Sequence, residues 1–141
     1  MMFDSDVLIW CLRGDPVAGR IVNSEPERST SIVSVIELLH GSRSAVQLRT
    51  ARDFVRKLEL RLLPVTEPIS YRAVQLIESH TLGDGLQLGD GLQLGDGLQL
   101  GDALIAATAL EHDETLITGN IRHFRPIHGL KLKTFRHAGV Q

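Results

Sequence analysis

The sequence predicts an α/β fold in which helices are layered on a central, mainly parallel sheet. Three observations favour it: short apolar runs typical of buried strands, helical segments between those runs, and a length of 141 residues, which suits one domain with a real core. We therefore treat residues 1–141 as a single domain. Hydrophobic residues make up 43% of the chain, yet no stretch approaches ~18 continuous apolar residues. The expected protein is globular and cytoplasmic, and it does not enter a membrane.

The N-terminal half alternates strands with helices. Its predicted elements are a strand that ends at Asp4, a helix to Arg13, a helix from Pro16 to near Asn23, a strand over 29–33, and helices over 34–40 and 45–60. Asp15 and Pro16 suit the N-cap and the first position of the second helix. In the last helix, Leu48, Ala51 and Val55 share one apolar face, so we expect that helix to pack on the core.

The C-terminal half adds further strands. Its predicted elements are a strand over 60–65, a helix over 67–80, an apolar helix that starts with Asp102, and strands over 114–118 and 130–135. Strands that alternate with helices in this way are typical of a parallel sheet. In such a sheet, ligands bind beyond the carboxyl ends of the strands. We therefore expect the functional residues at that edge.

A hexapeptide repeat separates the two longest helices of this half. Units of LGDGLQ start at Leu82, Leu88 and Leu94, and a fourth unit starts at Leu100 and continues as the apolar helix. Seven glycines lie between positions 83 and 101. Each glycine would cost about 1 kcal/mol in a helix interior. We therefore expect residues 82–101 to form an inserted loop.

The repeat also raises the question of which aspartate is functional. Asp84, Asp90 and Asp96 are each followed by Gly-Leu-Gln, whereas Asp102 is followed by an almost wholly apolar helix. A helix packed in the core fixes its first residues in space, and a glycine-rich loop does not. Asp102 is therefore the predicted functional acid of the four.

Acidic side chains follow the predicted strands or start a helix at the same sheet edge. Asp4 ends the first strand, Glu37 follows the second, and Asp102 starts the apolar helix. Carboxylates that crowd together repel, and the usual remedy is a divalent cation with oxygen ligands, Mg²⁺ or Mn²⁺. The pattern thus predicts metal-assisted hydrolysis of a phosphodiester.

The segments FDSDVLI, SIVSVIELLHG and LGDALIAATALEHDETLITGNIRHF resemble the PIN-domain nucleases, in particular the VapC-type toxins of bacterial toxin–antitoxin pairs. The resemblance spans nearly the whole chain except the repeat. It implies a three-layer α/β/α fold, with Asp4, Glu37 and Asp102 as metal ligands. It further implies an endoribonuclease that forms a homodimer and is held inactive by a cognate antitoxin.

The chain departs from the family pattern in one position of the expected site. Many PIN domains have a fourth acid where this chain has Asn120, which can supply an oxygen ligand or orient a water but adds no charge. Asp6 is the residue that can compensate, although we favour a cap on the helix after Asp4 for it. His123 is expected to pack with Phe124 rather than to reach the site.

Basic residues are concentrated in two segments. Six basic residues against two acids lie between positions 41 and 61, and no acid follows Glu114. Such an excess suits a phosphate backbone, although a solvated basic face would give the same pattern. The predicted RNA contacts are Arg43, Arg49, Arg52 and Arg122, with Arg56 and Arg125 as further candidates.

Two other functions remain open from the sequence. The run from Asp4 to Leu8 is close to the D-x-D-x-[TV] opening of haloacid-dehalogenase-like phosphatases, but the lysine and the later acidic pair that such enzymes need are not evident. A catalytically weakened PIN-type binding module is the other alternative, because Asn120 removes a charge.

Overall fold

A five-stranded parallel sheet lies at the centre of the computed structural model, which describes residues 1–85 and 98–139. The strands are β1 (Met2–Phe3), β2 (Ser29–Ser31), β3 (Arg61–Leu63), β4 (Leu116–Thr118) and β5 (Leu132–Thr134). Their order across the sheet is β3-β2-β1-β4-β5, and all the pairs are parallel. β1 is therefore central, and its carboxyl end opens onto the middle of the sheet edge.

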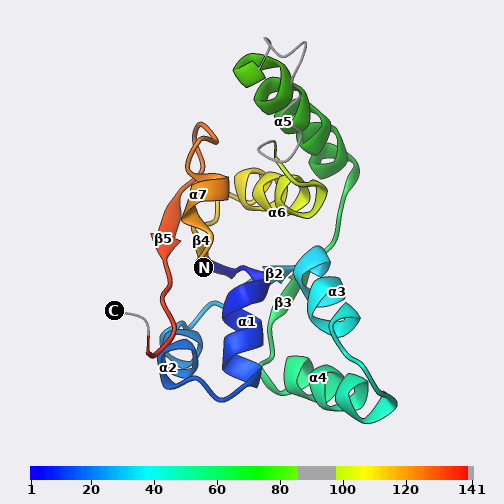
Figure 1. The fold of residues 1–141 in the computed structure, drawn as a ribbon, viewed down its shortest axis with the longest axis vertical. Helices are drawn as coiled ribbons and strands as arrows, with labels where there is room; N and C mark the ends of the chain where they lie inside the picture. The colour runs from blue at the N-terminus through cyan, green and yellow to red at the C-terminus, as the bar shows by residue number, and fades with distance from the viewer. Residues whose placement is uncertain (86–97, 140–141) are drawn as a thin grey trace.

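Helices cover both faces of the sheet (Figure 1). They are α1 (Ser5–Leu12), α2 (Pro16–Ser24), α3 (Ile32–His40), α4 (Ala45–Lys57), α5 (Glu67–Gly85), α6 (Leu100–Glu111) and α7 (Ile121–Phe124). α5 and α6 lie on one side of the strands, and α1, α2, α3 and α4 lie on the other. The predicted three-layer α/β/α fold is confirmed.

Alternating side chains along the strands build a core on each face. Met2 and Leu116 pack with residues of α5 and α6, whereas their neighbours Phe3 and Ile117 pack with residues of α1, α2, α3 and α4. This alternation follows from the two-residue period of a strand. β1 and β4 are buried on both faces, which explains their short apolar runs. β2 is equally buried but consists of Ser-Thr-Ser, and its three hydroxyls all take part in hydrogen bonds.

The boundaries of several elements differ from the expectation. The strand predicted over 29–33 ends at Ser31, because the Ser31 hydroxyl accepts a hydrogen bond of 3.0 Å from the Val33 N–H and caps α3 there. α5 extends to Gly85 rather than ending at His80, and α6 begins at Leu100.

Both ends of the loop predicted over 82–101 are therefore helical. Extending a formed helix adds one hydrogen bond for each residue fixed, which offsets the propensity cost of single glycines near its end. The rest of that predicted loop, over 86–97, lies outside the described residues. None of the helices in the described ranges has the length and apolar character needed to cross a membrane.

Candidate functional site

Asp4 is the most buried of the candidate acids, with 2% of its surface exposed. It follows β1 and caps α1, where Oδ1 accepts a hydrogen bond of 2.8 Å from the Ser5 N–H. Oδ2 accepts a hydrogen bond of 2.6 Å from the Thr118 hydroxyl. Because Phe3 pairs with Ile117, the ends of β1 and β4 bring these two residues side by side. The carboxylate of Asp4 is thus fixed from two directions.

Asp6 reaches across to the turn that follows β4. Its Oδ2 accepts a hydrogen bond of 2.8 Å from the Gly119 N–H. Its other oxygen, Oδ1, is buried and has no hydrogen-bond partner among the described residues. The interpretation of Asp6 as the cap of the first helix is wrong, because Asp4 occupies the cap position and Asp6 bonds to a segment far away in the sequence.

Asp102 lies in the first turn of α6, where the helix dipole favours a negative charge. Its side chain is 16% exposed, and Oδ2 lies 3.2 Å from Nδ1 of His123. The expectation that His123 packs with Phe124 away from the site is therefore wrong. α7 is a single short turn, and it places the imidazole beside α6 instead.

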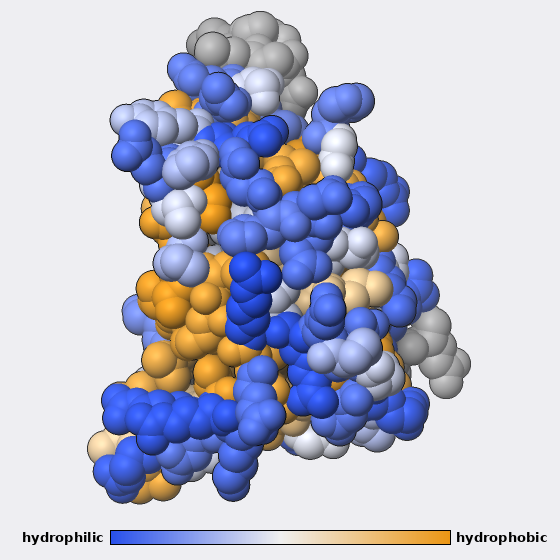
Figure 2. Space-filling model, turned by 180° about the vertical axis from the view of Figure 1, so that it is seen from behind, coloured by the Kyte–Doolittle hydropathy of each residue, from blue (hydrophilic) through white to orange (hydrophobic). Residues whose placement is uncertain are grey.

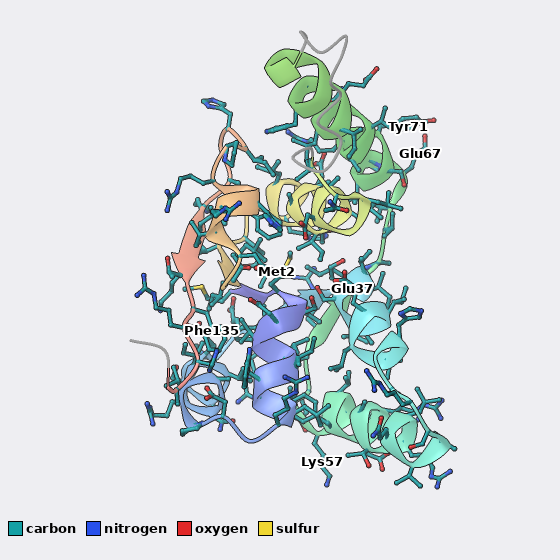
Figure 3. The ribbon with its side chains drawn as sticks, viewed as in Figure 1. Met2, Glu37, Lys57, Glu67, Tyr71 and Phe135 are labelled. Carbon is teal, nitrogen blue, oxygen red and sulfur yellow. The ribbon has the colours of Figure 1, made fainter. Side chains whose placement is uncertain are left out.

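Glu37 comes from α3 and faces the start of α6. Its Oε2 lies 3.0 Å from the position that a Cβ on Gly101 would occupy. The Ser5 hydroxyl hydrogen-bonds to its carboxylate and lowers its pKa, against the larger opposite effect of burial. Figure 3 shows Glu37 on one side of Met2 and Phe135 on the other, so the central strand separates α3 from the end of β5.

Asp4, Asp6, Glu37 and Asp102, which we call the acid cluster, form one electrostatic unit. Burial, followed by the charge of Asp6, raises the pKa of Asp4 to about 7, although the hydrogen bonds from Thr118 and Ser5 oppose the rise. Burial is also the main cause of a raised pKa at Asp6, at Glu37 and at Asp102, and the charge of Asp102 adds to it at the first two. Such mutual destabilisation of charged forms is typical of carboxylates that share a cation.

The donors of the acid cluster fit a hard divalent cation. They are all oxygens, the ligand type that Mg²⁺ and Mn²⁺ prefer. An anionic oxygen that is buried without a partner, as at Asp6 Oδ1, is costly unless a cation neutralises it. Within residues 1–85 and 98–139, no group of three acidic, cysteine or histidine side chains already stands in a metal-holding arrangement.

The remaining predicted site residues differ in where they lie. Asn120 occupies the N-cap position of α7, and its N–H donates a hydrogen bond of 2.9 Å to the Thr118 hydroxyl. Its side chain makes no cap hydrogen bond. Arg43 lines a groove together with Glu37, and Arg122 lines a second pocket with Asn120. Arg49 and Arg52 are exposed on α4 and line neither.

Gly119→Ala is expected to disrupt the site from the backbone. A Cβ at this position would lie 2.6 Å from Asp6 Oδ2 and 3.3 Å from the Phe135 carbonyl oxygen, so the Asp6 carboxylate must move and lose its bond to the Gly119 N–H. We expect a loss of about 1–3 kcal/mol in the free energy of unfolding. Chemical denaturation measures it.

Gly19→Ala is the matched control for this substitution. A Cβ on Gly19, within α2, meets no atom within 4 Å, so alanine there should be neutral or stabilise by up to ~1 kcal/mol. Equal stability of the two variants would contradict the assigned role of Gly119.

Comparisons with known proteins agree with this geometry. The family model of the PIN domain matches residues 1–128. VapBC2 from Rickettsia felis, solved with a promoter DNA fragment, is 19% identical, covers 96% of this chain and 98% of its own, and has a TM-score of 0.73. A toxin–antitoxin complex from Klebsiella pneumoniae is 25% identical over 92% of this chain and 93% of its own, with a TM-score of 0.70. DNA-bound VapBC from Salmonella typhimurium is 18% identical over 94% of this chain and 96% of its own, with a TM-score of 0.73. No curated protein sequence matches the chain.

Proposed function

The chain belongs to the PIN-domain family, and from that premise we propose that it is a VapC-type toxin, a metal-dependent endoribonuclease that an antitoxin holds inactive. The observation that carries the proposal is the acid cluster at the carboxyl edge of the sheet, where burial raises the pKa of each acid. The family match leaves the phosphatase alternative without support. An enzyme that cleaves RNA acts where RNA is present, and we therefore propose the cytoplasm as its location.

Asp4, Glu37 and Asp102 would hold Mg²⁺ or Mn²⁺, and Asp6 Oδ1 is a further oxygen within the same cluster. When bound, the cation supplies a hydroxide-like nucleophile and neutralises charge on the phosphate. Thr118 and Ser5 orient the carboxylate of Asp4 through their hydrogen bonds, and His123 orients that of Asp102. Asn120 lies beside Thr118 and is placed to orient a water or a phosphate oxygen.

A groove beside the acid cluster suits an antitoxin segment. It has a volume of about 630 Å³, and apolar residues of α1, α3 and α4 line it together with Glu37 and Arg43. Val46 stands in this groove with 63% of its surface exposed. We propose that an apolar segment of the antitoxin packs here and thereby reaches the acids. Val46→Glu should weaken that complex, because it places a charge against apolar side chains.

We also propose a homodimer formed through an apolar strip at the start of α5. The strip consists of Val65, which precedes α5, and of Tyr71 and Val74, which lie three residues apart on that helix; all three are exposed. Figure 2 shows apolar side chains gathered on the face opposite to the view of Figure 1, and Figure 3 shows Tyr71 on the outer side of α5. Exposed apolar patches of this kind mark interaction surfaces.

Val74→Glu is expected to convert the dimer into a monomer, because Val74 is 54% exposed on the strip and a second copy would bury the new charge. Sedimentation velocity measures the change. Val46→Glu introduces the same charge on another face and should leave the dimer intact. A dimer that survives Val74→Glu would place the interface elsewhere.

A cleavage assay tests the proposed function. Purified protein is incubated with RNA, DNA and a phosphate monoester, with and without Mg²⁺ or Mn²⁺, beside an Asp4→Ala control. RNA cleavage that requires both the metal and Asp4 supports the proposal. Turnover of the monoester would support the phosphatase, and RNA binding without any cleavage would support the binding module.

A further inference from the structure

A second pocket lies on the other side of the turn that carries Gly119 and Asn120. Its volume is about 350 Å³, and it is formed by this turn, by α7 and by the end of β5 with the two residues that follow it. Three arginines line it, Arg122, Arg125 and Arg136, and none of its lining residues is acidic. Within the described part of the chain, no carboxylate forms an ion pair with any of the three.

The fold brings these cations together from two elements. Arg122 and Arg125 lie in α7 and at its end, whereas Arg136 follows β5. The Phe135 N–H donates a hydrogen bond of 2.9 Å to the Thr118 carbonyl, which fixes the segment before Arg136 against the end of β4. Like charges held close together without a carboxylate favour an anion between them, and the planar guanidinium suits a phosphate in particular.

The pocket adjoins the acid cluster at Gly119. Gly119 lines the pocket, and its N–H is bonded to Asp6 of the acid cluster. An extended, multiply charged strand that presents one phosphate to the acids would therefore bring a neighbouring phosphate to the arginines. The acid cluster by itself repels phosphates, whereas the arginines attract them. A strand with several phosphates is therefore the ligand that the charges of the two sites favour together.

We propose that this pocket, which we call the arginine pocket, binds a phosphate of the RNA strand next to the phosphate that is hydrolysed. The inference rests on the proposed nuclease function and adds a substrate subsite to it. It assigns Arg125 and Arg136 roles in positioning the RNA strand. It assigns no such role to Arg49 and Arg52 on α4, which line neither pocket. The basic composition of the tail did not reveal Arg136 as part of a site.

The test compares Arg125→Gln and Arg136→Gln with Lys133→Gln, an exposed cation of β5 that does not line the pocket. Binding of a fluorescent single-stranded RNA, measured by anisotropy in EDTA, reports affinity without cleavage. Each pocket variant should bind the RNA about tenfold more weakly. The slope of log K against the logarithm of the salt concentration should become less steep by about 0.7. Lys133→Gln should bind within about twofold of the parent, since it removes one exposed charge that does not line the pocket.

A second set of substrates locates the phosphate. RNAs that carry one neutral methylphosphonate at successive positions are cleaved in the presence of Mg²⁺. A methylphosphonate at one position next to the cleaved bond should lower the rate at which the parent protein cleaves the RNA. The Arg136→Gln variant should cleave this RNA as fast as it cleaves the unmodified RNA, because the variant no longer contacts that phosphate.

The outcomes separate the subsite from the nuclease function. Cleavage by the parent with pocket variants that behave like Lys133→Gln would overturn the subsite and leave the nuclease in place. Arginine-dependent RNA binding without any cleavage would overturn the nuclease and support the pocket as a phosphate site. Pocket variants that lose the antitoxin while they bind RNA normally would overturn the subsite in favour of a protein contact.

Discussion

Asp102→Asn is expected to lower the rate of RNA cleavage by roughly 100-fold or more, because it removes the charge of a proposed metal ligand and leaves its shape. The carboxylate is held by His123, and its charge acts on Asp4, Asp6 and Glu37. The loss should appear in kcat rather than in the stability of the fold. Single-turnover cleavage of a defined RNA measures it, and circular dichroism confirms folding.

The repeat offers a matched control for this substitution. Asp96 stands in an identical Leu-Gly-Asp context one unit earlier, at a position outside the described residues. Asp96→Asn should leave the cleavage rate within about twofold, because we assign the metal ligand to Asp102 and not to Asp96. A loss of activity in Asp96→Asn, or full activity in Asp102→Asn, would show that the wrong aspartate has been assigned.

In the absence of divalent cations, the protein is expected to become less stable as the pH rises from about 4 to about 7. The pKa of Asp4 is about 7 in the fold, against an ordinary value of 3.8, so the folded state binds more protons than the unfolded chain between these values. The destabilisation is absent below the unfolded pKa, grows as the pH rises, and is complete above the folded pKa. Asp6, Glu37 and Asp102 act in the same direction.

The size of this pH effect can be measured in EDTA by urea denaturation of the parent and of Asp4→Asn. Each unit of pKa difference corresponds to about 1.4 kcal/mol, so Asp4 alone can contribute up to about 4 kcal/mol. Asp4→Asn should be the more stable protein near pH 8 and should lose this advantage near pH 4. Parent stability that rises with pH over this interval, or an equal slope in the variant, would contradict the burial of a charged Asp4.

The sequence predicted the order of the elements and the positions of the three main acids because both follow from local patterns. Short continuous apolar runs mark β1 and β4, and Asp4 lies where a strand of the predicted sheet ends. Parallel strands end at one edge, so an acid after one strand and an acid at the start of a helix meet without further information. The prediction that Asp4, Glu37 and Asp102 lie near one another therefore needed only the predicted topology, and the resemblance to PIN-domain nucleases selected the same three acids.

The parts that could not be predicted depend on contacts between distant residues. Asp6 bonds to Gly119, and Thr118 bonds to Asp4, across more than a hundred positions of sequence. From its position near the start of the helix, Asp6 is a plausible cap. Only the register of β1 against β4 shows that the turn after Thr118 lies close enough for the Asp6 carboxylate to accept a hydrogen bond from it instead. Arg136 joins Arg122 for the same reason, through the pairing of β4 with β5.

The most direct test of the acid cluster is its affinity for Mn²⁺, measured by electron paramagnetic resonance near pH 7. We expect the parent protein to bind Mn²⁺ and expect Asp4→Asn and Asp102→Asn each to weaken binding at least about tenfold. Asp53→Asn, an exposed acid of α4, should bind as the parent does. Mn²⁺ binding that is unchanged in Asp4→Asn and Asp102→Asn, or no binding by the parent, would contradict the assignment of these acids to a metal site.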